Sequence, residues 1–218
     1  MDILDLRHDI VAELSKSDGT YQDTYLEKFL LDAIVDMCKT TYCYTEEIAD
    51  TSVLDTSTYT LTPTTSNAKL VGLISARWGT DDDEGELFVT NKRELDEHNR
   101  FWKQATGQPN AILYNGDNTI TFNRIPDTTV LTGVAIIYEV AIAPSNIDSI
   151  VPVVIELRHL ETVTHYVKWK TYEHPDFFNF KAADRFEKKY IIGKSRLRHE
   201  VMDEFIGNTT VKARSFLY

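Results

Sequence analysis

The acidic run at residues 81–86 is the strongest candidate for a chemical site in this sequence of 218 residues. Carboxylate oxygens gathered on one loop are the ligands that Ca²⁺ prefers. The run lacks the alternating ligands and the twelfth-position Glu of an EF-hand, and adjacent acids repel one another. We therefore favour a solvated loop tip, with a calcium-binding module or metal-dependent enzyme as the alternative. The acids concerned are Asp81, Asp82, Asp83, Glu84 and Glu86.

The spacing of histidines and cysteines indicates no metal or catalytic site. His159 and His165 lie six residues apart on one predicted helix, so they point to different faces and are expected to be exposed or hydrogen-bonded. Cys38 and Cys43 lie five residues apart in a stretch predicted to be helical, where a disulfide would be strained. Two thiols also fall short of the four ligands of a zinc site. Both cysteines are therefore expected to be buried or half-buried free thiols.

Four common cofactor-binding and catalytic motifs are absent from the sequence. It contains no Gly-x-Gly-x-x-Gly, no Gly-x-x-x-x-Gly-Lys-Ser/Thr, no His-Glu-x-x-His and no Gly-x-Ser-x-Gly. We predict a protein that is not an enzyme and binds no cofactor or metal ion. Its aromatic residues have the spacing of core positions, which favours packing over a stacking platform for sugars or bases. These residues are Trp78, Phe88, Phe101, Trp102, Tyr114 and Phe122.

The C-terminal segment, residues 207–218, ends in three large apolar side chains, where a chain end normally carries small polar ones. Burial of one such side chain is worth ~1.5–3 kcal/mol. The segment either folds back on its own helices or docks as an extended strand on another chain. Its two cations suit an oppositely charged partner and so favour docking. The predicted contact residues are Val211, Lys212, Ala213, Arg214, Phe216, Leu217 and Tyr218.

Two different hydrophobic periods divide the chain. Apolar residues recur at helical spacing in residues 3–14, 24–37, 153–172 and 178–201. One helix alone cannot bury such a stripe, so these four segments are expected to pack together.

A two-residue period, which is typical of strands, begins at about residue 56. Within this region, Asn91 followed by Glu94 predicts the start of a short helix, and Asn115-Gly116 predicts a hairpin turn. The strand candidates are residues 59–62, 69–78, 86–90, 111–114, 119–123 and 130–141.

The order of these segments predicts an α+β fold: a four-helix bundle with an antiparallel β domain inserted between the second and third helices, plus an extended C-terminal tail. Residues 1–55 and 150–206 are assigned to the helical bundle. Residues 56–149 are assigned to the inserted β domain with its short helix, and residues 207–218 to the tail.

The charge is negative overall but unevenly distributed. The chain has a net charge of −11 and a pI near 5.0. Residues 1–100 hold 21 acids and 9 bases, whereas residues 156–218 hold 9 acids and 12 bases. An acidic protein lacks the positive surface that grips a phosphate backbone, although the basic C-terminal third suits an acidic protein partner. With no apolar run near the ~20 residues of a membrane span, we expect a soluble protein made in a cytoplasm.

Residues 101–127 carry an ordered set of features: a Trp, then Thr-Gly-x-Pro, a hairpin, and Pro-Asp. This succession resembles the head-to-tail adaptor (connector or neck) proteins of tailed bacteriophages. The order of two helices, a β region and two further helices extends the resemblance over most of the chain. The residues that carry it are Trp102, Thr106, Gly107, Pro109, Asn115, Gly116 and Pro126.

The resemblance implies a structural virion protein of the neck, made in the host cytoplasm and located between the capsid portal and the tail. Such adaptors form a homo-oligomeric ring, usually of twelve copies, which extends the DNA channel. The implied partners are other copies of the chain, the portal protein, a tail or neck protein, and duplex DNA that passes without specific binding; no membrane is implied. In related adaptors the C-terminal segment lies in or along the portal, which would give residues 211–218 a partner.

Overall fold

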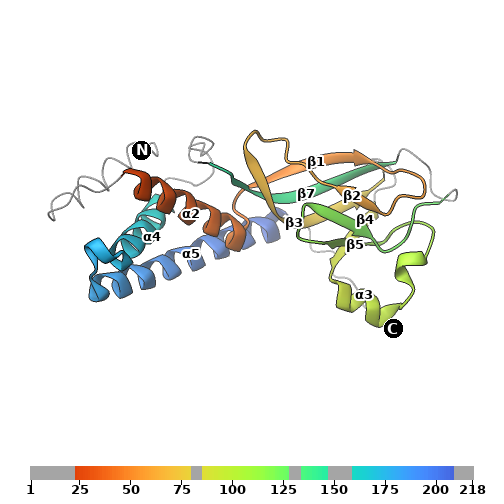
Figure 1. Cartoon of the computed structure of the whole chain (residues 1–218). Coiled ribbons are helices and arrows are strands. Elements are labelled where there is room, and N and C mark those ends of the chain that lie inside the picture. Colours follow the sequence, from red (N-terminus) through yellow and green to blue (C-terminus); the bar gives the residue numbers. More distant parts are fainter. Residues whose placement is uncertain (1–22, 80–84, 128–133, 147–158, 209–218) are drawn as a thin grey trace. The chain divides into compact units, whose positions relative to one another are not determined.

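The computed structural model describes residues 23–79, 85–127, 134–146 and 159–208 (Figure 1). The chain divides into two compact units. The helical unit comprises Met1–Cys43 and Asn146–Tyr218, and the sheet unit comprises Tyr44–Ser145.

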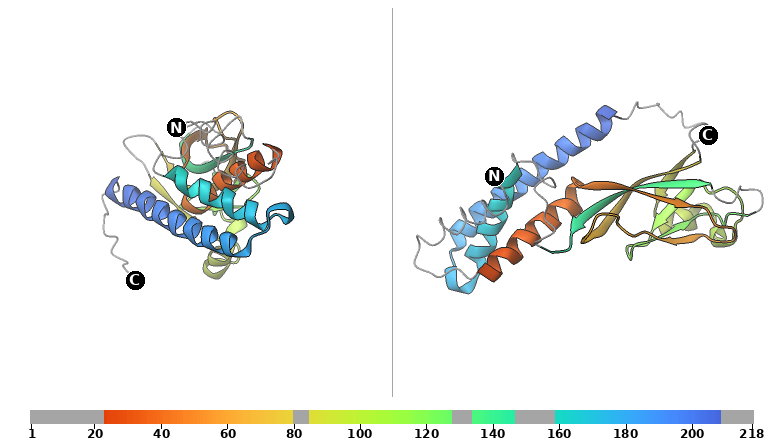
Figure 2. Two further views of the ribbon diagram at one scale, coloured as in Figure 1. Left: turned by 90° about the vertical axis from the view of Figure 1, so that its left-hand side faces the viewer. Right: turned by 90° about the horizontal axis from the view of Figure 1, so that it is seen from above.

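The described part of the helical unit is built from three α-helices that lie side by side (Figures 1 and 2). They are α2 (Asp23–Thr41), α4 (Leu160–Glu173) and α5 (Phe180–Asn208), and the short 3-10 helix η5 (Pro175–Phe177) connects the last two. Each contributes an apolar stripe at helical spacing, and burying these stripes stabilises the helices more than their intrinsic propensity does. The buried apolar residues include Leu26, Leu30, Ile34 and Met37 of α2, Val163 and Val167 of α4, and Ala183, Tyr190 and Leu197 of α5.

The sheet unit contains a seven-stranded mixed sheet in the order β1-β7-β3-β4-β5-β6-β2. The long strands β3 and β7 pair with each other in the half of this order that begins with β1, and the register between them shifts twice, at Leu70/Gly72 and at Leu73/Ser75. Such bulges bend the strands and increase their twist, in keeping with the curled sheet seen in Figure 1. The strands are β1 (Thr45–Thr51), β2 (Thr58–Thr60), β3 (Ala68–Trp78), β4 (Gly85–Thr90), β5 (Ala111–Tyr114), β6 (Thr119–Phe122) and β7 (Ala135–Pro144).

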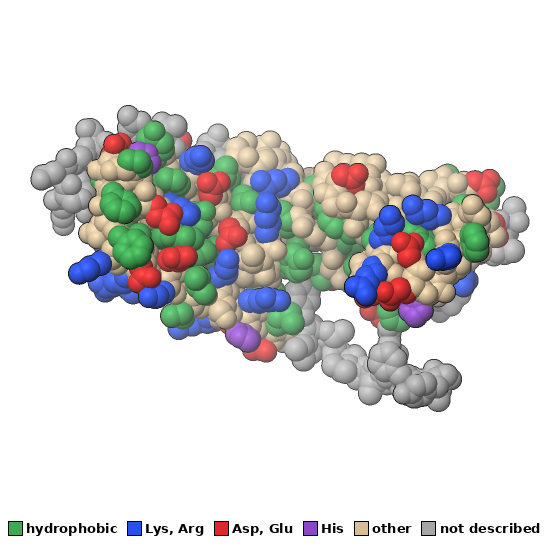
Figure 3. Space-filling view, turned by 60° about the horizontal axis from the view of Figure 1, so that its bottom comes forward, with side chains coloured by type: hydrophobic (Ala, Val, Ile, Leu, Met, Phe, Trp, Pro, Cys, Tyr) green, Lys and Arg blue, Asp and Glu red, His purple; other side chains and the backbone are tan. Residues whose placement is uncertain are grey.

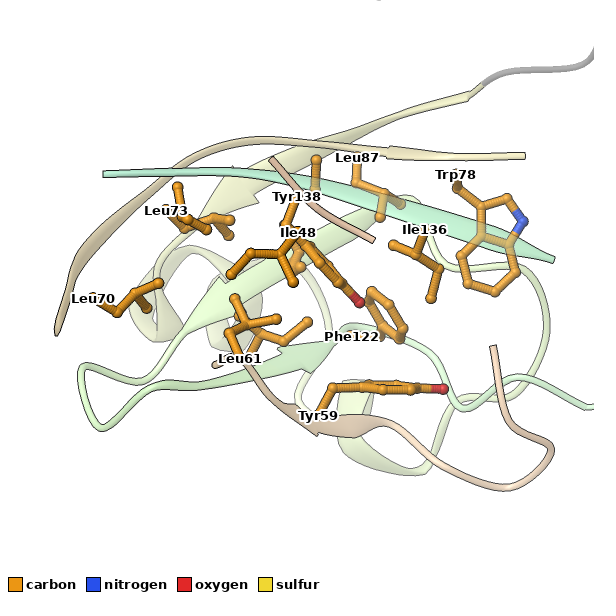
Figure 4. Close-up of a cluster of buried hydrophobic side chains, with 14 of the residues drawn as sticks. Ile48, Tyr59, Leu61, Leu70, Leu73, Trp78, Leu87, Phe122, Ile136 and Tyr138 are labelled. Atoms are coloured by element: carbon orange, nitrogen blue, oxygen red, sulfur yellow. The ribbon is translucent and has the colours of Figure 1, made fainter. Parts of the chain in front are cut away.

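The core of the sheet unit lies inside this curl. Figure 4 shows Tyr59, Phe122 and Tyr138 pointing toward one another from three different strands. The ring centroids of Tyr59 and Phe122 are 5.2 Å apart, and Trp78 meets Phe122 edge-on at 5.7 Å. Aromatic contacts of this kind add to the free energy gained by apolar burial, so the rings hold the sheet in its curled form.

The predicted fold class is wrong in two respects. The four described α-helices do not form one bundle, because α3 (Lys92–His98) belongs to the sheet unit and the predicted segment 3–14 lies outside the described residues. The sheet is mixed and not antiparallel, because β4 and β5 pair in parallel. A parallel pair requires a long crossover connection, and the segment holding α3 and the 3-10 helix η2 (Trp102–Gln104) supplies it.

Several local predictions are confirmed. The Asn91 side chain accepts a hydrogen bond from the Glu94 amide and so caps α3. The predicted strands at residues 69–78, 86–90, 111–114 and 119–123 agree with β3 to β6 to within one residue at each end.

In the part of the chain that the structure describes, no helix is both long and apolar enough to cross a membrane.

Candidate interaction surfaces

Trp102 of the adaptor-like segment has a structural role. It is buried, and its indole Nε1 donates a hydrogen bond to Asp96 Oδ1 at 2.8 Å. The ring packs with Leu95 of α3 and Ala111 of β5 in a small core of its own. Trp102 therefore fixes the crossover connection that makes β4 and β5 parallel.

The Thr-Gly-x-Pro and Pro-Asp parts of the segment meet each other in the structure. Thr106 and Ile125 form an isolated parallel bridge, in which the Gly107 amide donates to the Ile125 carbonyl at 3.0 Å. Gly107 has φ +115°, a conformation that strongly favours glycine. Pro109 and Pro126 are both buried. The two prolines and the Gly107 bridge are thus part of the packed structure, whereas Thr106 is exposed.

The predicted Asn-Gly turn is present at the tip of the same hairpin. The Asn115 amide donates to the Thr119 carbonyl at 2.9 Å, and the Asn115 side chain bonds the hydroxyls of Thr119 and Thr121. Positive φ angles occur at Gly116 and Asn118. Residues 115–118 of the turn are exposed, which leaves them accessible to a partner.

Two aromatic residues of the sheet unit differ from the prediction of core packing. Phe88 of β4 is 52% exposed and Phe101 is 71% exposed, whereas Trp78, Trp102 and Phe122 are buried as predicted. Phe88 alternates with Leu87, which is buried in the core, so it faces the opposite side of the sheet. Large aromatic side chains in water are typical of surfaces that bind another protein.

The helical unit also exposes large apolar side chains. Phe178 and Phe180 are about 70% exposed at the start of α5, and Ile191, Ile192 and Met202 are more than half exposed along the same helix. Figure 3 shows a face of the molecule on which hydrophobic side chains lie among lysines and arginines. Both units therefore present apolar surface that a partner can cover.

A polar groove of about 290 Å³ between α4 and α5 is a feature that the sequence pattern did not reveal. His159 and His165, predicted to lie on different faces, both line it. His159 is buried and its Nε2 lies 2.8 Å from Glu200 Oε2, while His165 Nε2 lies 3.4 Å from Glu161. The available signal was Gly193, an isolated glycine within a helical pattern, which indicates a close approach of another element.

Two histidine–carboxylate pairs lie in this groove. Each imidazole has a carboxylate partner, and the described lining holds neither a cysteine nor a serine. Burial and the nearby Lys189 ammonium lower the pKa of His165, so that side chain is neutral at pH 7. Among the described residues, no group of three or more His, Cys, Asp or Glu is arranged to hold a metal ion.

Two of the predicted sites lie mainly outside the described residues. Asp81 to Glu84 of the acidic loop are not described, and of its five acids only Glu86, at the start of β4, is placed. The C-terminal contact residues 211–218 are also not described. Both stay predictions from the sequence.

The chain matches the family model described as SU10 adaptor protein over residues 1–209. None of the curated proteins searched matches it. The matched range includes the sheet unit, most of the helical unit and all of the adaptor-like segment, so it confirms the resemblance to phage adaptors. The chain therefore belongs to the SU10 adaptor protein family and is a structural adaptor of a bacteriophage virion.

Proposed function

We propose that this chain is a head-to-tail adaptor, which forms a ring between the capsid portal and the tail or neck of the virion and extends the channel for DNA. The observation that carries the proposal is the family match over residues 1–209. We further propose that the role is architectural and involves no catalysis.

The exposed apolar surface supports assembly into a ring. A closed ring is built from head-to-tail contacts, so each copy needs two different surfaces. Phe101 of the sheet unit and Phe180 of the helical unit are each 71% exposed and are candidates for such surfaces. Following the resemblance, the proposed ring has twelve copies.

Native mass spectrometry and negative-stain microscopy of the protein mixed with its portal ring test this assembly. We expect a defined ring on the portal. The exchanges Phe101→Ser and Phe180→Ser should each weaken assembly while leaving the melting temperature unchanged, because both side chains are exposed. Lys92→Ser, which changes an exposed position of α3, is the matched control. A protein that stays monomeric with the portal present would contradict the proposal.

The net charge of −11 supports a channel through which DNA passes without adhering. Identical copies in a ring add their negative charges, and this field repels the phosphate backbone. In fluorescence anisotropy with duplex DNA at physiological salt, we expect binding no tighter than ordinary non-specific association, with a Kd above ~10⁻⁶ M. Sequence-specific, nanomolar binding would contradict the conduit role.

The C-terminal residues 211–218 are the proposed contact with the portal protein. A chain shortened after Asn208, where α5 ends, should lose affinity for the portal ring and keep its melting temperature. A triple exchange of Phe216, Leu217 and Tyr218 to serine should reproduce the loss, whereas Lys212→Gln should have a smaller effect. A large fall in melting temperature would instead assign the segment to the protein's own core.

A further inference from the structure

The end of helix α2 brings the two cysteines of the chain together. The helix ends at Thr41, and the next residue, Tyr42, has φ 55°, in the left-handed region. The Tyr42 amide donates to the Cys38 carbonyl at 3.0 Å. This combination is the left-handed C-cap, in which the first residue beyond the helix satisfies a carbonyl of the last turn.

This cap turns the chain back on the last turn of the helix. The second residue beyond the end commonly contacts the residue three positions before the cap, and here these two positions are Cys43 and Cys38. The Cys38 side chain lies within hydrogen-bonding reach of the Cys43 thiol. We expected a disulfide to be strained because both cysteines were predicted to lie on one helix. In the structure α2 ends at Thr41, so Cys43 lies beyond the helix and this reason no longer applies.

The environment of the pair distinguishes the two thiols. Cys38 is fully buried, whereas Cys43 is half-buried and can be reached from solvent. The hydrogen bond from Cys38 lowers the pKa of Cys43 to about 7, against the opposing effect of burial and with a further contribution from Thr41. A thiolate is the nucleophile in disulfide exchange, so Cys43 is the attacking group and Cys38 the resolving one.

We propose that Cys38 and Cys43 form a redox-active dithiol that reacts with small-molecule disulfides and closes to an intramolecular disulfide. The Cys43 thiolate attacks one sulfur of a disulfide RSSR, forming a mixed disulfide and releasing one thiolate RS⁻. The Cys38 thiol then gives up its proton to solvent, and its sulfur attacks Cys43 Sγ and releases the second RS⁻. The protein dithiol is oxidised by two electrons, and RSSR is reduced to two thiols.

The proposed bond would respond to the compartment of the protein. Cytoplasmic glutathione and thioredoxin keep such pairs reduced, and an oxidising exterior favours the disulfide. Closure would tie the last turn of α2 to the residue that directly precedes the sheet unit in the chain. The inference rests on the two thiols and their cap, and it does not depend on the proposed ring.

Incubation of the reduced full-length protein with oxidised glutathione tests the proposal. Intact mass spectrometry should show the loss of two hydrogen atoms without retained glutathione, and Ellman titration should fall from two free thiols to none. Peptide mapping should find Cys38 joined to Cys43 in a monomer. Two retained glutathiones, a disulfide between chains, or no reaction with the thiols intact would each contradict the proposal.

Single-cysteine variants separate the two roles. Cys38→Ala should trap one glutathione stably on Cys43, because the resolving thiol is missing. Cys43→Ala should react at least tenfold more slowly than the native protein, because Cys38 is buried. Circular dichroism of both variants verifies that they are folded.

An arsenical gives an independent readout. Phenylarsine oxide, which bridges two adjacent thiols, should bind the reduced native protein one to one and neither variant tightly. Equal binding by the native protein and the variants would overturn the pairing.

Discussion

In the sheet unit, Tyr59, Trp78 and Phe122 pack ring against ring in one apolar core, whereas in the helical unit a charged group, Asp36, joins α2 to α5. Asp36 accepts hydrogen bonds from the Tyr190 hydroxyl and from Lys194, whose Nζ lies 2.8 Å from Oδ2. The sheet unit thus depends most on apolar burial, and the helical unit adds polar contacts that fix how its helices meet. Variants in the two units should therefore respond differently to truncation and to pH.

The largest effect is expected from Phe122→Ala in the sheet unit. Phe122 is 1% exposed and touches both Tyr59 and Trp78. Its truncation leaves a cavity and should lower the free energy of unfolding by about 3–5 kcal/mol. Urea unfolding followed by tryptophan fluorescence, in a Trp169→Phe background, reports on Trp78 and Trp102 of this unit. Phe88→Ala, at an exposed position, is the control and should cost less than about 1 kcal/mol. Equal losses for both variants would contradict the assigned core.

Gly193→Ala tests the contact between α4 and α5 in the helical unit. A Cβ at Gly193 would overlap Thr162 Oγ1 and lie 2.8 Å from Thr162 Cγ2. We expect a loss of about 1–2 kcal/mol, since overpacking outweighs the gain in helix propensity. In a Thr162→Ala background the same exchange should become neutral or stabilising in urea unfolding. Equal losses in both backgrounds would show that the two side chains do not meet.

Tyr138→Phe should stabilise the sheet unit. The Tyr138 hydroxyl is buried without a hydrogen-bond partner among the described residues, and burial raises the pKa of this phenol. Removing an unsatisfied polar atom while keeping the ring should raise the unfolding free energy by about 1 kcal/mol. Thermal and urea unfolding measure the change. A less stable variant would mean that the hydroxyl does have a partner.

Asp36→Asn should give a small effect and the clearest pH signature. Burial raises the pKa of Asp36, but hydrogen bonds from Lys194 and Tyr190 outweigh it, so the net shift is downward from 3.8. Such a group stabilises the fold above pH 3.8, and this contribution is lost as the pH falls through the lower folded pKa. Because the carboxylate is 38% exposed, we expect a loss of only about 1 kcal/mol at pH 7.

Urea unfolding at pH 7 and pH 3 tests this prediction. The difference between native protein and Asp36→Asn should shrink at the lower pH, where the native carboxylate begins to be protonated. Asp184→Asn, which removes an exposed partner of Lys188, is the matched control and should change stability by less than about 0.5 kcal/mol at either pH. A difference in unfolding free energy that is independent of pH would show that the ionised Asp36 carboxylate does not stabilise the contact between α2 and α5.

Local patterns predicted much of the secondary structure, and they failed where burial is one-sided or pairing is distant. Strand β1 escaped detection because Ile48 is its only buried residue and acids occupy three of its seven positions. Its place in the sheet comes from pairing with β7, some ninety residues along the chain. The parallel pairing of β4 and β5 was missed for a similar reason, since no local pattern reports strand direction.

The candidate surfaces were less predictable than the elements. Alternation along β4 puts one side chain of each neighbouring pair on each face, but it does not say which face the core covers. Phe88 was therefore expected in the core and lies outside it. The spacing of Cys38 and Cys43 did not show that the two thiols lie together. They do so because Tyr42 adopts a left-handed conformation, and no glycine marks that position in the sequence.

The sequence by itself determined the alternation of helical and strand periods, the cap at Asn91, the hairpin turn and the ordered segment that identifies the family. These features depend on residues a few positions apart, where sterics and local hydrogen bonds decide the conformation. Only the tertiary structure decided the strand order, the exposed aromatic residues, the histidine-lined groove and the adjacency of the two thiols. Those depend on contacts between segments that the chain separates, or on how one turn closes, and neither is recorded in residue spacing.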